Sequence, residues 1–113
     1  PPRTWSVVAS GAGPDRAEAR LTFDPARGTL DYDVAASGVS EEELHAIALR
    51  RRDGEGHLSV VLRIAGPGNL HAQGTELLTP NLRSWLEAGA LSLEVFTRAH
   101  PFGSARAALE VPR

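Results

Sequence analysis

The sequence predicts an all-β protein, an antiparallel Greek-key β-sandwich with one short helix near residues 80–88. Apolar residues recur with period two through most of the chain, which is the pattern of strands that bury one face and expose the other. Short clusters of Gly, Pro, Asn and Asp separate the alternating segments, as turns between antiparallel strands do. Together these two observations favour two packed sheets, with a closed barrel as the alternative architecture.

Seven segments have the strand pattern: residues 4–10, 16–24, 29–37, 44–50, 57–64, 90–98 and 104–111. The alternation is clearest in the second segment, where Ala17, Ala19, Leu21 and Phe23 alternate with polar and charged residues. The same period assigns an inward-facing set to the other segments: Trp5, Val7, Ala9, Leu30, Tyr32, Val34, Ile47, Leu58, Val60, Leu62, Ile64, Leu91, Leu93, Val95, Ala107, Leu109 and Val111.

The connections between these segments have recognisable turn chemistry. Pro25 presets one dihedral of a tight turn and Gly28 tolerates positive φ, so the second and third segments are predicted to form a hairpin. The stretches 11–15, 38–43, 52–56 and 65–69 also read as turns or loops. In the last connection, Pro101 and Gly103 predict the turn of a closing hairpin.

One segment has helical spacing instead. Thr79 is a natural N-cap, Pro80 suits the first helical position, and Gly89 suits a left-handed residue after the last turn. Leu82 and Leu86 lie four residues apart on one face, so a short helix is predicted between these ends.

Composition predicts a single domain over residues 1–113, either free-standing or a module of a longer chain. The net charge is −2, with 12 arginines and no lysine spread among 14 acidic residues, so neither nucleic acid nor an anionic membrane is expected as a partner. No apolar run reaches membrane-spanning length. The absence of cysteine excludes disulfides, thiolate metal sites and a cysteine nucleophile.

Few residues carry catalytic chemistry. Asp31 and Asp33 share an outward face about 7 Å apart along one strand, where a solvated carboxylate pair is more usual than an acid/base or calcium site. No Gly-x-Ser-x-Gly nucleophile motif is present. Histidines 57, 71 and 100 fall in or beside predicted turns, whereas His45 is expected on the inner side of its strand, half-buried and hydrogen-bonded.

The order of several features resembles the chordin (CHRD) domain family over residues 5–111. The pieces that carry the resemblance are the strand GTLDYDV, Gly54 and Gly56 before LSVVL, the stretch LEAG, Thr97, Pro101, Gly103 and Arg106. The resemblance implies a β-sandwich related to Cu,Zn superoxide dismutase and to immunoglobulin-like domains. It also implies a secreted or extracytoplasmic, cell-envelope location.

Many bacterial members of that family carry a His-x-His motif and a third histidine, which together suit a copper or zinc ion. Alignment of the motifs puts Ala46, Ala48 and Phe96 at these three positions, so no metal and no other cofactor is predicted. Period two places the three side chains on the same side of their sheet, and we expect Phe96 to cover the two alanine methyl groups. Arg106 is predicted to point outward beside Glu94 on the neighbouring strand and to pair with it.

The sequence therefore predicts a non-catalytic module for protein interaction or structural spacing, with Ala46, Ala48, Phe96 and Arg106 on the interaction face. The predicted partner is a protein of unknown identity, and a homo-oligomer is left open. The first alternative is a copper- or zinc-binding, dismutase-like domain with other ligands, such as His45 or His57. A hydrolase or carbohydrate binder that uses the two strand aspartates is the second.

Overall fold

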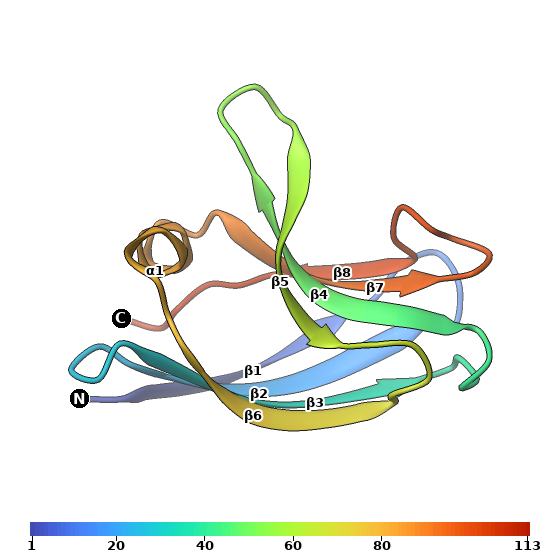
Figure 1. Cartoon of the computed structure of the whole chain (residues 1–113), viewed down its shortest axis with the longest axis horizontal. Coiled ribbons are helices and arrows are strands. Elements are labelled where there is room, and N and C mark those ends of the chain that lie inside the picture. The colour runs from blue at the N-terminus through green and yellow to red at the C-terminus, as the bar shows by residue number, and fades with distance from the viewer.

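Figure 1 shows the computed structural model of the chain, which describes all residues from 1 to 113. The helix is α1 (Pro80–Glu87), and the strands are β1 (Arg3–Ala9), β2 (Arg16–Asp24), β3 (Thr29–Ser37), β4 (Leu44–Arg52), β5 (Leu58–Ala65), β6 (His71–Leu77), β7 (Leu91–Thr97) and β8 (Ala105–Ala108). The predicted all-β sandwich with one short helix is confirmed.

Two four-stranded antiparallel sheets form the layers of the sandwich. The first sheet has the order β1-β2-β3-β6 and the second has the order β5-β4-β7-β8. The chain passes from the first sheet to the second between β3 and β4, returns between β5 and β6, and crosses again through α1 (Figure 1). Ser10 and Arg106 exchange two backbone hydrogen bonds of 3.2 and 3.0 Å, which join the β1 and β8 edges.

The apolar core lies between the sheets and contains 21 buried residues. All four apolar positions of the second predicted segment belong to it, as period two requires: Ala17, Ala19, Leu21 and Phe23. The helix closes one end by burying Leu82 and Leu86 against the same core. Each buried Leu or Phe contributes about 1.5–3 kcal/mol, so the core fixes which side of every strand faces outward.

The helix has the ends that the sequence predicts. Thr79 Oγ1 accepts a hydrogen bond from the Leu82 N–H at 3.2 Å, and Gly89 has φ +72°. The Ala90 N–H then donates to the Trp85 carbonyl at 2.9 Å, which satisfies a carbonyl at the helix end. No helical segment has both the length and the apolar character that a membrane crossing needs.

Strand β6 was not predicted from the sequence. It pairs with β3 and buries only Ala72. The next inward position is Gly74, which lies opposite Tyr32. A Cβ atom on Gly74 would lie 2.6 Å from the Tyr32 hydroxyl oxygen, so the tyrosine side chain occupies the space of the missing one. The strand therefore lacks the apolar alternation by which the others are recognised.

The predicted orientation of β5 is correct for one half and wrong for the other. Leu62 and Ile64 pack against the core, but Leu58 and Val60 are 36% and 56% exposed. Pairing shifts between Leu49 and Arg50, so Val61 is an extra residue in the strand. A bulge of this kind reverses the faces of the residues beyond it. The β4–β5 hairpin also projects away from the sandwich (Figure 1), which leaves these two side chains outside the core.

Candidate interaction face of the second sheet

The outer face, meaning the side of the second sheet that points away from the first, has polar and apolar side chains buried against it. All seven residues of β7 are buried, although only alternate ones reach the core between the sheets. The outward ones are Ser92, Glu94 and Phe96. The loop of residues 98–104 covers part of this face, because a Cβ on Gly103 would lie 3.2 Å from Glu94 Oε1. The φ of Gly103 is +115°, a backbone conformation that favours glycine, and the absence of a side chain allows the close approach to Glu94.

Ala46, Ala48 and Phe96 form an apolar cluster of their own on the outer face, which we call the apolar patch. Their exposed fractions are 6%, 2% and 7%. Ala46 lies opposite Phe96 in the pairing of β4 with β7, so the ring and the methyl groups meet. The structure thus confirms the predicted contact of Phe96 with the two alanine methyl groups.

The apolar patch forms the floor of a shallow groove of about 210 Å³. Residues from β4, β5, β7 and the β7–β8 loop line it: His45, Ala46, Ala48, Val60, Arg63, Phe96 and Pro101. Val60 reaches this side because of the bulge in β5. The groove can receive an apolar side chain, because the apolar patch forms its floor and Val60 and Pro101 add apolar surface to its walls.

His45 was predicted to point inward and to be half-buried, and this prediction is wrong. The histidine is exposed and lines the groove. Leu44 pairs with Thr97 and Ala46 pairs with Phe96, which leaves His45 as an extra residue in β4. At such a bulge two successive side chains share a side, and period two gives no sign of it.

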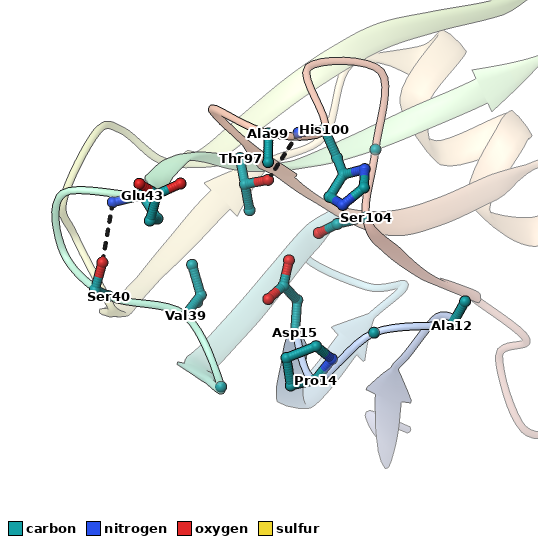
Figure 2. Close-up of a pocket in the computed structure, with 13 residues that line it drawn as sticks. Ala12, Pro14, Asp15, Val39, Ser40, Glu43, Thr97, Ala99, His100 and Ser104 are labelled. Atoms are coloured by element: carbon teal, nitrogen blue, oxygen red, sulfur yellow. Dashed lines mark hydrogen bonds between the residues drawn. The ribbon is translucent and has the colours of Figure 1, made fainter.

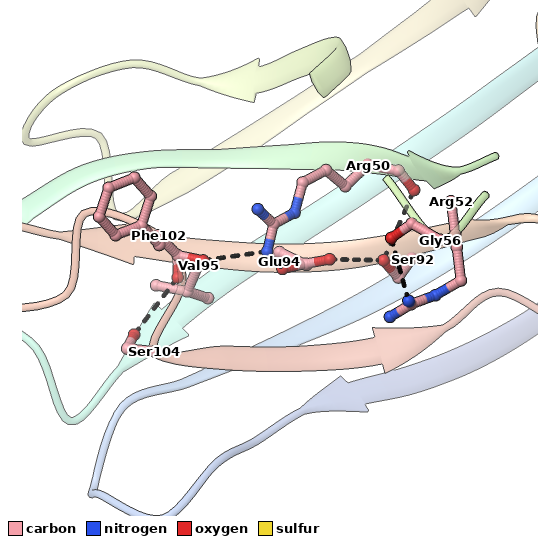
Figure 3. A network of polar contacts seen from close by, with 8 residues as sticks. All are labelled: Arg50, Arg52, Gly56, Ser92, Glu94, Val95, Phe102 and Ser104. Carbon is pink, nitrogen blue, oxygen red and sulfur yellow. Dashed lines mark hydrogen bonds and ion pairs between the residues drawn. The ribbon is translucent and has the colours of Figure 1, made fainter. Parts of the chain in front are cut away.

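A buried ion pair joins β4 to β7 (Figure 3), and its arginine lies next to the apolar patch. The Arg50 guanidinium donates to a Glu94 carboxylate oxygen, and their side chains are only 14% and 2% exposed. Ser92 Oγ donates to the other carboxylate oxygen at 2.7 Å. Arg50 also donates to the Phe102 carbonyl at 3.0 Å and lies 5.1 Å from the centre of the Phe96 ring. One arginine therefore links β4, β7 and the covering loop.

The predicted ion pair between Arg106 and Glu94 is wrong. The two residues are direct partners in the pairing of β7 with β8, but the Glu94 carboxylate is bonded to Arg50 and Ser92 instead. Arg106 is exposed and lies over the outer face between two shallow hollows. Its guanidinium forms no ion pair, because the arginine ion pairs of the structure are those of Arg27, Arg50 and Arg83.

A larger cleft of about 480 Å³ lies at the loop end of the sandwich (Figure 2). The β1–β2, β3–β4 and β7–β8 loops form it, and most of its lining is polar or glycine. Its ionisable residues are Asp15, Glu43 and His100. The sequence predicted three separate turns here and not their meeting. His57 is not part of this cleft, because it lies at the tip of the β4–β5 hairpin beside Asp53 and Glu55.

The two strand aspartates hydrogen-bond to β6. Asp31 accepts from Thr75 at 2.7 Å. Asp33 accepts from Gln73 at 2.9 Å and contacts His71 Nε2 at 2.6 Å. These two bonds, that of Gln73 first, lower the pKa of Asp33 below its ordinary value. Both carboxylates therefore bind the neighbouring strand β6, and exposed His71 is the first residue of that strand, directly after the 66–70 connection.

No group of three or more His, Cys, Asp or Glu side chains is placed to hold a metal ion.

The pKa of Asp53 is lowered by hydrogen bonds from the backbone, chiefly the His57 N–H, with a smaller contribution from the Glu55 N–H. This carboxylate thus stabilises the hairpin turn.

Comparisons of the chain with protein-family models, with curated proteins and with solved structures find no match.

Proposed function

We propose that the chain is a non-catalytic, secreted or cell-envelope module of the chordin type, which binds a protein partner through the outer face of the second sheet. The observation that carries the proposal is the groove with its apolar floor, together with two exposed apolar residues, of which Val60 lines the groove and Phe102 lines a second hollow of the same face. Val60 is 56% exposed and Phe102 is 85% exposed. Aromatic and aliphatic side chains around a hollow are typical of the centre of an interface.

The chordin-type assignment rests on the sequence motifs and is supported by two structural features. The expected sandwich architecture is present. The positions aligned with the family's histidines, Ala46, Ala48 and Phe96, lie in one cluster. A Greek-key connection is in keeping with β6 lying beside β3 after the chain has passed through β4 and β5. In this proposal the apolar patch replaces a metal site and serves as the floor of a protein-binding groove.

The test is capture of a partner by the immobilised chain from culture medium and envelope extract, followed by titration of the purified partner. The variant Val60→Ser/Phe102→Ser removes the two most exposed apolar residues of the outer face. Its matched control is Val8→Ser/Leu77→Ser on the first sheet, where the wild-type side chains are 47% and 71% exposed.

We expect the first variant to lose at least about tenfold in affinity and the control to retain the wild-type affinity. A partner that binds both variants as tightly as the wild type would contradict the proposed face. If the wild type retains no protein at all, structural spacing becomes the better explanation of the module.

A further inference from the structure

We infer that the outer face binds an acidic protein segment that places one apolar side chain in the groove. This inference rests on the proposed function and names the chemistry of its partner. It is argued from the charge distribution of the two outer faces, from the size of the groove and from the arginines around it.

The two outer faces carry opposite charge. Outward positions of the second sheet carry four arginines and a single acid, and Arg50 neutralises that acid in the buried pair. The arginines left over are Arg52, Arg63 and Arg106. Outward positions of the first sheet carry two arginines and four acids: Arg16, Arg20, Glu18, Asp24, Asp31 and Asp33. A chain with a net charge of −2 thus gathers unpaired positive charge on the outward strand positions of the second sheet, and Arg63 lines the groove itself.

The groove has the size of a side chain. Its volume of about 210 Å³ is below the range of about 300–1,000 Å³ that is usual for small-molecule sites. The apolar patch and Val60 favour an aliphatic or aromatic group. Arg63 lines the groove itself, whereas Arg106 lies over a hollow that it shares with Phe102 and Glu94. A segment that crosses the face therefore meets a guanidinium group at each side of the groove.

A protein segment fits these observations better than a uniform polyanion. Guanidinium groups recognise carboxylates with two parallel hydrogen bonds. A sulfated polysaccharide or a nucleic acid would use the arginines but would leave Val60, Phe102 and the groove without a partner. An acidic segment with a single apolar residue uses both kinds of contact.

The test is a titration of the isotope-labelled chain with the capped peptide DEDLEDE, followed by NMR. Two control peptides replace the central leucine (DEDSEDE) or reverse the charge (KRKLKRK). We expect shifts at the amides of Ala46, Ala48 and Phe96 and at the methyl groups of the two alanines, with DEDLEDE binding tighter than either control. Raising the ionic strength should weaken binding, because exposed charges are screened within about 10 Å at 0.1 M salt.

Variants assign the charge contribution to single arginines. Arg63→Gln and Arg106→Gln should each weaken binding roughly threefold. Arg63→Lys keeps the charge but loses the paired hydrogen bonds, so its affinity should fall between those of the wild type and Arg63→Gln. The matched control is Arg20→Gln, which removes a positive charge from the first sheet and should leave binding unchanged. Circular dichroism confirms that each variant is folded.

Three outcomes would overturn the inference: no shifts on the outer face, equal binding of DEDSEDE, or tighter binding of dextran sulfate that is unaffected by Val60→Ser/Phe102→Ser. If the peptide fails but a captured partner still depends on Val60 and Phe102, the acidic chemistry is wrong and the proposed function stands. If the captured partner is also indifferent to these residues, both proposals fail.

Discussion

The Glu94 carboxylate and the Arg50 guanidinium form a buried ion pair on the outer side of β7, separate from the apolar core between the sheets. Arg50 extends this contact to the carbonyl of Phe102 in the β7–β8 loop. The pair therefore links the outer face to the loop that carries its most exposed apolar residue. Changes to either partner should affect both the stability of the sandwich and the geometry of the groove.

Arg50→Met should destabilise the fold by about 3–5 kcal/mol, because it leaves the Glu94 carboxylate buried without a counter-charge. The double variant Arg50→Met/Glu94→Leu should cost at least about 2 kcal/mol less than the single one, since an apolar replacement of both partners leaves no buried charge. Urea denaturation gives the free energies of unfolding. Additive costs of Arg50→Met and Glu94→Leu would show that the pair is not coupled.

Gly103→Ala should destabilise the protein by about 1–3 kcal/mol, because an L-residue is strained at a φ of +115°. The added methyl group would also lie 3.2 Å from Glu94 Oε1 and 3.4 Å from a terminal Arg50 nitrogen. Gly13→Ala is the matched control, since nothing lies within 4 Å of its Cβ position. Its effect on the urea midpoint should be small, and equal effects of the two changes would refute a special role of Gly103.

Elements with a strong local signal could be predicted from the sequence. The cap formed by Thr79, the first-turn Pro80 and the left-handed Gly89 place α1 correctly, because each depends only on its neighbours. Strand β2 was equally clear, since its period-two pattern is unbroken. The contact of the apolar patch was also predicted, because two strands that pair side by side bring outward positions together.

Features that depend on tertiary contacts could not be predicted. The bulges that turn His45 and Val60 to the outer face leave no mark in the apolar pattern. Strand β6 was missed because Tyr32, far away in sequence, occupies the space over Gly74. The partner of Glu94 was predicted as Arg106, its direct cross-strand neighbour, but the long Arg50 side chain on β4 reaches the carboxylate from the other side.

Asp33→Asn should lower the stability at neutral pH and have little effect in acid. The pKa of Asp33 is below its ordinary value near 3.8, so ionised Asp33 stabilises the fold above that value. This contribution is lost as the pH falls through the lower pKa of the folded state. Thermal unfolding from pH 7 to pH 2 should therefore show a gap between wild type and variant that closes below about pH 4.

Gln73→Leu removes the hydrogen bond that lowers this pKa most and is the companion variant for Asp33→Asn. It should raise the pKa of Asp33 towards its ordinary value. The stability that Asp33 contributes at neutral pH, and that is lost in acid, should therefore be smaller in this variant than in the wild type. A stability gap between wild type and Asp33→Asn that persists unchanged at pH 2 would contradict the assignment.

The triple variant Ala46→His/Ala48→His/Phe96→His should bind zinc or copper more tightly than the wild type. The three positions lie in one cluster, and imidazole groups at these positions would converge on the outer face with the ligand number of a catalytic-type zinc site. At a zinc concentration one hundred times the dissociation constant, binding should stabilise the folded variant by about 2.7 kcal/mol. Calorimetric titration and zinc-dependent thermal unfolding measure both quantities.

The double variant Ala46→His/Ala48→His, with Phe96 retained, is the control for this prediction. It offers two of the three imidazoles and should bind the metal more weakly than the triple variant. If the folded triple variant binds zinc and copper no better than the double one, the side chain at position 96 does not act as a ligand together with those at positions 46 and 48. That result would count against the proposed chordin-type alignment, because this alignment assigns all three positions to a single metal site of that family.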